Sequence, residues 1–183
     1  MEELQAIESC EGVKLLEQIS SERGLLWEKI ETLNKVIGKL PDTLLHKAGE
    51  KQSNKMKEVY PLKQHIEGGM YTREIFMPKG NLIVSMIHKQ NHPSFLLKGK
   101  LSFITDTGEI KNIEAPYKIF TKTGTQRVLY IHEDSEWCCV YKTDATTFEE
   151  AEADVYTNDY RELPIELITK NKLLWQESQQ QQD

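Results

Sequence analysis

The sequence predicts a mainly β protein with a helical arm before the β unit and a short helix after it. Residues 59–145 contain short apolar runs of period two, separated by turn residues. Residues 1–46 carry an apolar stripe at helical spacing, and the chain becomes acidic after residue 145, as the first turn of a helix favours. Short strands at near-regular spacing are typical of a closed barrel or a double-sheet jelly roll.

Composition limits the classes of partner. The chain has 183 residues and a formal net charge of −6, which disfavours a nucleic-acid partner held by phosphate neutralisation. No apolar run approaches the roughly 20 residues that span a bilayer, so we expect no membrane segment. The acidic start, MEELQAIESCEG, lacks the features of a signal peptide. The 3 cysteines cannot form a closed disulfide framework, and together these observations predict a cytoplasmic protein.

Residues 1–46 are predicted to be a helical arm that ends near Pro41. Its apolar stripe comprises Ile19, Ile30, Leu26, Leu33, Ile37, Leu40 and Leu44. Two interpretations stay open: the stripe packs on the domain's own core, or it mediates assembly into a homo-oligomer. Residues 47–58 are polar and basic and are predicted to be a linker.

The β unit is predicted over residues 59–145, with turn signals such as Pro78-Lys79-Gly80 and Asp106-Thr107-Gly108 between the strands. The predicted strands are Tyr71–Met77, Leu82–His88, Ser94–Leu97, Leu101–Thr105, Glu109–Ile113, Lys118–Thr121, Gln126–His132 and Trp137–Lys142. Trp137, Cys138 and Cys139 are predicted to be core residues of the last strand.

Residues 146–175 are predicted to be a C-terminal helical segment. Thr146 or Thr147 is a suitable cap for a short helix, and Pro164 suits the first turn of a second helix that ends near Trp175. The glutamine-rich residues 176–183 have nothing to bury and are predicted to be disordered.

The stretch Met77–Gly99 holds the first candidate site. His88 and His92 follow an apolar run, and Pro93 disfavours a helix at His92, so the pair is expected at a strand end and the loop beyond it.

This stretch resembles the first motif of the cupin superfamily. Met86, His88 and His92 stand where that motif has two histidines and a glutamate, and Gly99 matches its last glycine. The later run from Lys122 to Arg127 resembles the second motif, with Arg127 in the slot of the fourth ligand. The segment from Pro61 to Tyr141 is most similar to small cupin-like proteins of bacteriophages. The matching residues are His65, Gly69, Tyr71, Arg73, Glu74, Ile75, Pro78, Gly80, His88, Lys89, His92, Lys98, Gly99, Ala115, Pro116, Gly124, Thr125, Arg127, Glu133, Asp134 and Trp137.

The resemblance implies a cupin-type barrel or jelly roll with a site inside it. His88 and His92 would be metal ligands, and a third would come from His65, Glu74 or His132. The ion would be one divalent metal (Fe, Zn, Mn or Ni), or the site would hold none. Arg127 cannot ligate a metal, but it suits a carboxylate or phosphate, or an internal ion pair with Glu74 or Glu133. The other candidate ligand-binding residues are Met86, Tyr71 and Tyr130.

Two functions follow from these residues. The first is a non-catalytic cupin that binds a small ligand, a metal or a protein, self-assembles, and serves as a virion-associated or host-directed accessory, with a phage structural protein or a host protein as partner. The second is a metal-dependent dioxygenase or isomerase acting on a small anionic substrate. An acidic side chain that shares a coordination point with both histidines would favour the second. An epimerase-like site built on Tyr130 and His132 has less support.

Overall fold

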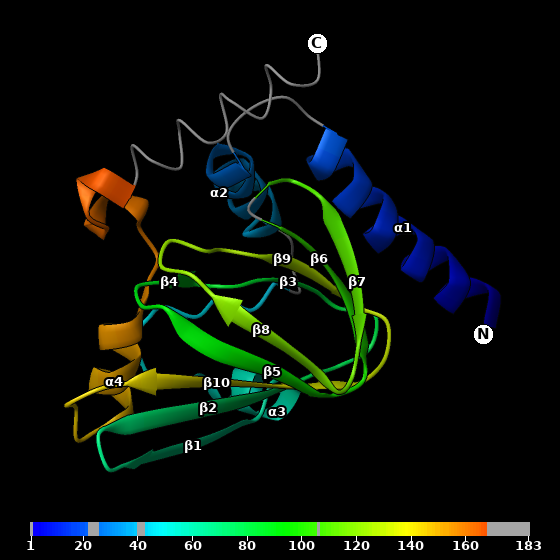
Figure 1. Cartoon of the computed structure of the whole chain (residues 1–183). Helices are drawn as coiled ribbons and strands as arrows, with labels where there is room; N and C mark the ends of the chain where they lie inside the picture. Colours follow the sequence, from blue (N-terminus) through cyan, green and yellow to red (C-terminus); the bar gives the residue numbers. More distant parts are fainter. Residues whose placement is uncertain (1, 22–25, 40–42, 106, 168–183) are drawn as a thin grey trace.

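The computed structural model describes residues 2–21, 26–39, 43–105 and 107–167, and for residues 2–11 only the backbone. Two antiparallel sheets face each other (Figure 1). The first contains, in order, β1 (Leu62–Glu67), β2 (Met70–Met77), β10 (Ser135–Lys142), β5 (His92–Lys98) and β8 (Tyr117–Thr121). The second contains β3 (Leu82–Val84), β9 (Val128–Ile131), β6 (Lys100–Ile104) and β7 (Ile110–Glu114). A short pair joins β11 (Tyr156–Thr157) to β4 (Ile87–His88).

The strand order is that of a jelly roll. From β2 onward the chain passes back and forth between the two sheets, and the last long strand, β10, pairs with β2. This arrangement places β2 and β10, which are far apart in the sequence, side by side in one sheet. The predicted mainly β class is therefore confirmed, and the described strands form two large sheets and the short β11–β4 pair rather than one closed barrel.

Side chains of alternating direction build the core between the sheets. The buried members include Tyr71, Leu101, Ile131, Trp137 and Tyr141. Because side chains alternate along a strand, the odd-numbered residues of β2 and β10 face this core and the even-numbered ones face outward. Trp137 and Cys139 are buried as predicted, whereas Cys138 faces outward and is not a core residue.

The N-terminal helices cover the outer face of the four-stranded sheet. They are α1 (Glu2–Ser21) and α2 (Leu26–Ile37), and Figure 1 shows both on the side of β6, β7 and β9. Leu16, Ile19 and Ile30 are buried in a second cluster with Ile104 and Tyr130. Ile19, Leu26, Ile30 and Leu33 of the stripe thus pack on the chain's own core, as in the first of the two interpretations, whereas Ile37 and Leu44 belong to neither core cluster. Leu40 lies outside the described residues.

Gly12 allows α1 to approach this sheet closely. A Cβ atom at residue 12 would overlap the ring of Tyr130. We expect Gly12→Ala to destabilise the fold, since overpacking costs about 1–3 kcal/mol and exceeds the roughly 1 kcal/mol that alanine gains over glycine in a helix. Urea unfolding measures the change, and a variant more stable than the wild type would contradict this packing of α1.

Three short elements differ from the sequence expectations. Helix α3 (Asn54–Val59) occupies part of the predicted linker, with Ser53 accepting a hydrogen bond from the Met56 amide as its N-cap. The strands β1 (6 residues) and β11 (2 residues) were not predicted, because neither contains a long run of alternating polar and apolar residues. The predicted cap at Thr147 is confirmed, since its hydroxyl accepts from the Glu150 amide at the start of α4 (Phe148–Val155).

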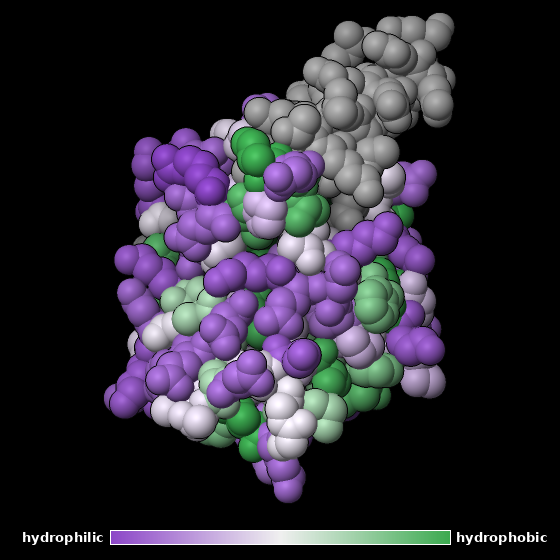
Figure 2. All heavy atoms as spheres, turned by 60° about the vertical axis from the view of Figure 1, so that its left-hand side comes forward, coloured by the Kyte–Doolittle hydropathy of each residue, from purple (hydrophilic) through white to green (hydrophobic). Residues whose placement is uncertain are grey.

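After α4, the structure describes the C-terminal segment only as far as residue 167. A 3-10 turn spans Tyr160–Glu162, and residues 165–167 are helical. The remainder of the helix predicted to end near Trp175 and the tail 176–183 lie outside the described residues. No helix within the described residues is long and apolar enough to span a bilayer. On the face seen in Figure 2, hydrophilic side chains predominate, with hydrophobic ones interspersed.

Candidate functional site

His88 and His92 come together between the sheets. His88 ends β4 and His92 begins β5, so both lie at strand ends as predicted, although His92 belongs to a strand and not to the loop. Both side chains are buried, with 5% and 1% exposure, and their ring centroids lie 4.7 Å apart. The ring of Tyr141 packs 4.1 Å from that of His92.

Hydrogen bonds fix the same tautomer in both imidazoles. The Tyr141 hydroxyl donates to the Tyr156 hydroxyl at 2.7 Å, so it accepts from Nδ1–H of His88 at 3.0 Å. Nδ1–H of His92 donates to the Gln90 carbonyl at 2.9 Å. In each neutral ring Nε2 is therefore an acceptor. Nε2 of His92 is buried and has no hydrogen-bond partner within the described part of the chain.

Burial and nearby cations keep both rings neutral. Burial lowers the pKa of His92 to about 4, against the hydrogen bond to Gln90, and the charge of Arg127 acts in the same direction as burial. Burial also lowers the pKa of His88 well below its usual value, and His92, Arg127 and Arg73 add to the effect. Two neutral imidazole acceptors thus lie in this end of the sandwich, where the charge of Arg127 opposes their protonation.

Arg127 lies near the histidines, whose pKa values its charge lowers, and it also lines a pocket that neither histidine lines. Its side chain is 7% exposed, its guanidinium lies 5.2 Å from the Phe103 ring, and Nη1 donates to the Thr121 hydroxyl at 3.3 Å. Thr121 is the cross-strand neighbour of His92 in the β5–β8 register. Thr121 and His92 both face inward from neighbouring strands. The Arg127 guanidinium, which bonds Thr121, and the His92 imidazole therefore lie in the same part of the interior.

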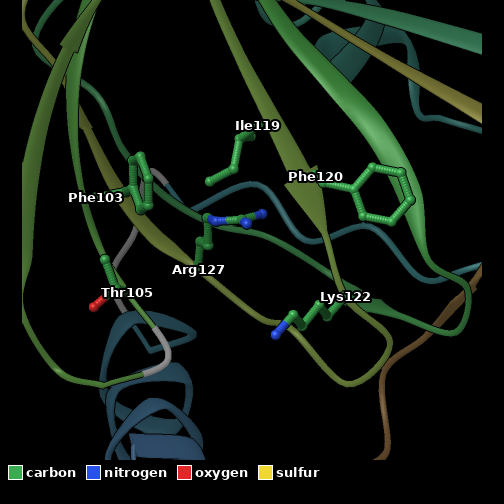
Figure 3. Close-up of a pocket in the computed structure, with 6 residues that line it drawn as sticks. All are labelled: Phe103, Thr105, Ile119, Phe120, Lys122 and Arg127. Carbon is green, nitrogen blue, oxygen red and sulfur yellow. The ribbon is translucent and has the colours of Figure 1, made fainter.

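The pocket itself has a volume of about 130 Å³. Figure 3 shows the Arg127 guanidinium extending between Phe103 and β8, with Ile119 above it and Lys122 at the rim. The lining combines two cationic groups, the Thr105 hydroxyl and apolar side chains. The full lining is Phe103, Thr105, Ile119, Phe120, Lys122 and Arg127. This set suits a small organic anion.

A buried ion network closes the interior near the histidines. Nε of Arg73 donates to Oε1 of Glu152 at 3.2 Å, and Oε2 of Glu152 lies 2.8 Å from Nε2 of His46. Burial opposes ionisation of Glu152, but the His46 hydrogen bond and the Arg73 charge outweigh it and hold the pKa of that carboxyl below its usual value. The guanidinium of Arg73 also lies 5.5 Å from the ring of Tyr156, which links α4 and β11 to β2.

Sequence reasoning missed Arg73, Tyr141, Tyr156 and Glu152 as parts of the site. Arg73 and Tyr141 are in phase with the buried residues of their strands, a signal that the sequence carries. Glu152 lies in an acidic run that resembles a solvated helix face, and no sequence signal marks it as buried.

The other predicted metal ligands lie away from the histidine pair, whereas the ring of Tyr71 stacks on that of Tyr141 beside the pair. His65 is exposed on β1 beside Glu67, and Glu74 faces outward and bonds Lys63 at 2.6 Å. His132 bonds Ser102 in the other sheet and packs edge-on against Tyr130, whose ring lies under α1. Tyr71 is a core residue hydrogen-bonded to Gln64, and Met86 packs at the edge of the same core.

The donor set around His88 and His92 does not fit a metal held by three or four protein ligands. In the described part of the chain, no three side chains among His, Cys, Asp and Glu come together in a metal-binding group. The cations next to the pair are Arg73 and Arg127, whose charges oppose a bound cation. The carboxylate that a facial triad of two histidines and one acid needs is not supplied by Glu74.

No protein-family model matches the chain, and no curated protein matches it either. Solved structures that resemble it include the cupin 2 domain of an XRE family transcriptional regulator from Enterobacter cloacae. That match has 12% sequence identity, covers 48% of this chain and 99% of that one, and has a TM-score of 0.40.

Two further structures are similar. A cupin 2 domain-containing protein from Halorhodospira halophila has 9% identity, with 57% of this chain and 74% of that chain covered and a TM-score of 0.42. An acetylacetone dioxygenase from Acinetobacter johnsonii has 16% identity, with 56% and 78% covered and a TM-score of 0.39. Since these TM-scores are below 0.5, the jelly-roll assignment rests on the strand order of this chain, and neither a ligand nor an activity follows from the similarities.

Proposed function

We propose that this chain is a non-catalytic jelly-roll protein of the cupin type that binds a small hydroxycarboxylate between its sheets. The observation that carries the proposal is the position of Arg127. Its guanidinium is enclosed by the two sheets, stacks on Phe103 and lines a pocket that Lys122 also borders. A planar guanidinium in such a setting favours bidentate pairing with a carboxylate.

The hydroxyl of the ligand is inferred from the two histidines. Nε2 of His92 is a buried acceptor without a partner in the described chain, and burial of such a group is costly. The pKa of about 4 keeps His92 neutral at pH 7, so the atom stays an acceptor. A ligand whose carboxylate binds Arg127 in the pocket would satisfy both groups if its hydroxyl reached His92, which is not itself among the residues that line the pocket.

Binding is favoured over metal-dependent catalysis by the donor set. The alternative, a dioxygenase or isomerase, needs an acid at the coordination point of the histidines, and the candidate acid Glu74 faces the opposite side of its sheet. Arg127 would bind an anionic ligand both in a binding protein and in a metal-dependent enzyme. We therefore propose the anionic ligand class together with the binding role.

Calorimetric titration tests the proposal with matched pairs of acids. We expect lactate, 2-hydroxyisovalerate or mandelate to bind more tightly than propionate, isovalerate or phenylacetate by about tenfold, the value of one good hydrogen bond. Arg127→Gln should weaken binding by about 10–100-fold, as expected for a charge-assisted hydrogen bond. Lys122→Gln, which alters only an exposed rim residue, should weaken it less and leave the fold unchanged.

Arg161→Gln is the matched control, because Arg161 is exposed and pairs with Asp159 far along the chain from the pocket residues. It should bind like the wild type. Absence of saturable binding by all three hydroxyacids, or binding that both Arg127→Gln and Lys122→Gln leave unchanged, would overturn the proposal.

The finer resemblance adds a biological setting to the proposal. From the resemblance in sequence of Pro61–Tyr141 to small cupin-like proteins of bacteriophages, we propose a role in the host cytoplasm or on the virion, with a phage structural protein or a host protein as partner. Detection of the chain in purified virions by mass spectrometry would support the virion role, and its exclusion from them would leave the host-directed one.

A further inference from the structure

The outer face of the five-stranded sheet is apolar over three neighbouring strands. Strands β5 and β10 alternate mainly between buried and partly buried residues, β8 alternates between partly buried and exposed ones, and the outward residues of the three strands are mostly apolar. Leu97 is 49% exposed and Phe120 is 64% exposed. Figure 3 shows Phe120 on the side of β8 opposite to Ile119. We call this surface the sheet patch; it comprises Pro93, Phe95, Leu97, Phe120, Cys138 and Val140.

The sheet patch differs from the other outer face in what lies over it. The outer residues Ile104, Val128 and Tyr130 of the four-stranded sheet are buried beneath α1 and α2. Figure 1 shows these helices on that side only, with the five-stranded sheet on the opposite side of the molecule. The solvated side of an antiparallel sheet is ordinarily polar, so a contiguous apolar strip on it is typical of an interaction surface.

Charges of opposite sign flank the sheet patch in one row. The strand registers align Lys118, Phe95, Cys138 and Glu74 across β8, β5, β10 and β2. All four point outward, with the basic Lys118 on β8 and the acidic Glu74 on β2, and the register continues to the exposed Lys63 on the edge strand β1. Glu74 is also bonded to the exposed Lys63 on β1, so its carboxylate is already in place at the edge of the patch.

This order of residues is complementary to itself. A two-fold axis parallel to the strands, between β10 and β5, lays β10 of one copy over β5 of the other and β8 over β2. Cys138 then faces Phe95 of the second copy, and Lys118 faces Glu74 of the second copy. Each contact occurs twice, as an isologous interface requires. Two sheets packed in this way have nearly aligned strands, a common sheet-on-sheet arrangement.

We propose that the sheet patch is the contact surface of a two-fold dimer of this chain. The helical arm is not the contact, because Leu16, Ile19 and Ile30 are already buried within one copy. Of the sheet-patch residues, Phe120 also lines the pocket proposed for the ligand, whereas the residues changed in the tests below, Phe95, Lys118 and Glu74, do not.

Light scattering coupled to size exclusion, with sedimentation over a range of concentrations, tests the dimer. We expect the full-length wild type to be a dimer at micromolar concentration and Phe95→Asp to be a monomer. The control is Val36→Asp, since Val36 is 59% exposed on α2, and it should remain dimeric. Circular dichroism establishes that each variant is folded.

Charge reversal tests the register of the two copies. Lys118→Glu alone and Glu74→Lys alone should each weaken dimerisation at least tenfold, because each places like charges opposite one another. The double variant should recover most of the lost affinity, because the opposite charges face each other again. A wild type that is monomeric at about 100 μM, a dimer that Phe95→Asp leaves intact, or a double variant no better than the single ones would overturn the proposal.

Discussion

Replacing Glu152 with glutamine should lower the free energy of unfolding by about 3 kcal/mol, because it leaves a buried guanidinium without its counter-charge. Arg73 and Glu152 are 9% and 4% exposed, and Nε of Arg73 donates to Oε1 of Glu152 at 3.2 Å. The carboxylate also holds His46, so one substitution disrupts contacts to both the N-terminal segment and β2. For a chain of this size the loss corresponds to a melting temperature lower by about 10 °C.

The control for this change is Glu166→Gln. Glu166 is exposed near the end of the described chain, and its substitution should alter stability by less than about 0.5 kcal/mol. A double-mutant cycle with Arg73→Met should show coupling, since removing the second partner no longer strands a charge. Equal melting temperatures for Glu152→Gln and Glu166→Gln would contradict a buried ion network at this position.

Acidification should destabilise the wild type by about 3 kcal/mol through His92 alone, given a pKa of about 4 in the fold and about 6.5 in the unfolded chain. The sign follows from proton binding. Between these pKa values the unfolded state binds the proton and the folded state does not. The contribution is therefore fully present above pH 6.5 and is lost as the pH falls toward 4. His88, whose pKa is also lowered by burial, acts in the same direction.

Urea unfolding of the wild type and His92→Asn from pH 7 to pH 4.5 isolates this contribution. The difference in stability between the two proteins should shrink as the pH falls. His65→Asn is the matched control, because it makes the same substitution at an exposed histidine on β1. Parallel profiles for the wild type and His92→Asn would show that the buried imidazole does not resist protonation.

The sequence predicts most of the long strands because their burial follows a local pattern, although the predicted strand Leu82–His88 is two strands, β3 and β4. The alternation in β10 and the apolar core of β9 are local signals that tertiary packing reinforces. The pairing of β11 with β4 and the position of α3 depend on contacts between distant segments, such as the Lys89 amide with the Val155 carbonyl, and no local pattern encodes them.

The candidate site is predictable only in part for the same reason. The spacing of His88 and His92 brings them together at neighbouring strand ends, as the sequence indicates. The prediction of Glu74 as a third metal ligand is wrong because the alternation of β2 directs Arg73 inward and Glu74 outward. The carboxylate, which suits a metal, therefore lies on the outer face of the sheet, away from the histidines. The sequence shows Arg73 and Glu74 next to each other, but it does not show which of the two faces the core.

The most direct test of a ligand held by Arg127 and two neutral imidazoles is calorimetric titration of the wild type with mandelate, with and without EDTA. If protein groups alone hold the hydroxycarboxylate, we expect saturable binding with the same affinity in both buffers. Binding that disappears with EDTA and returns on adding back a divalent metal would contradict the proposed site and favour the metal-dependent alternative.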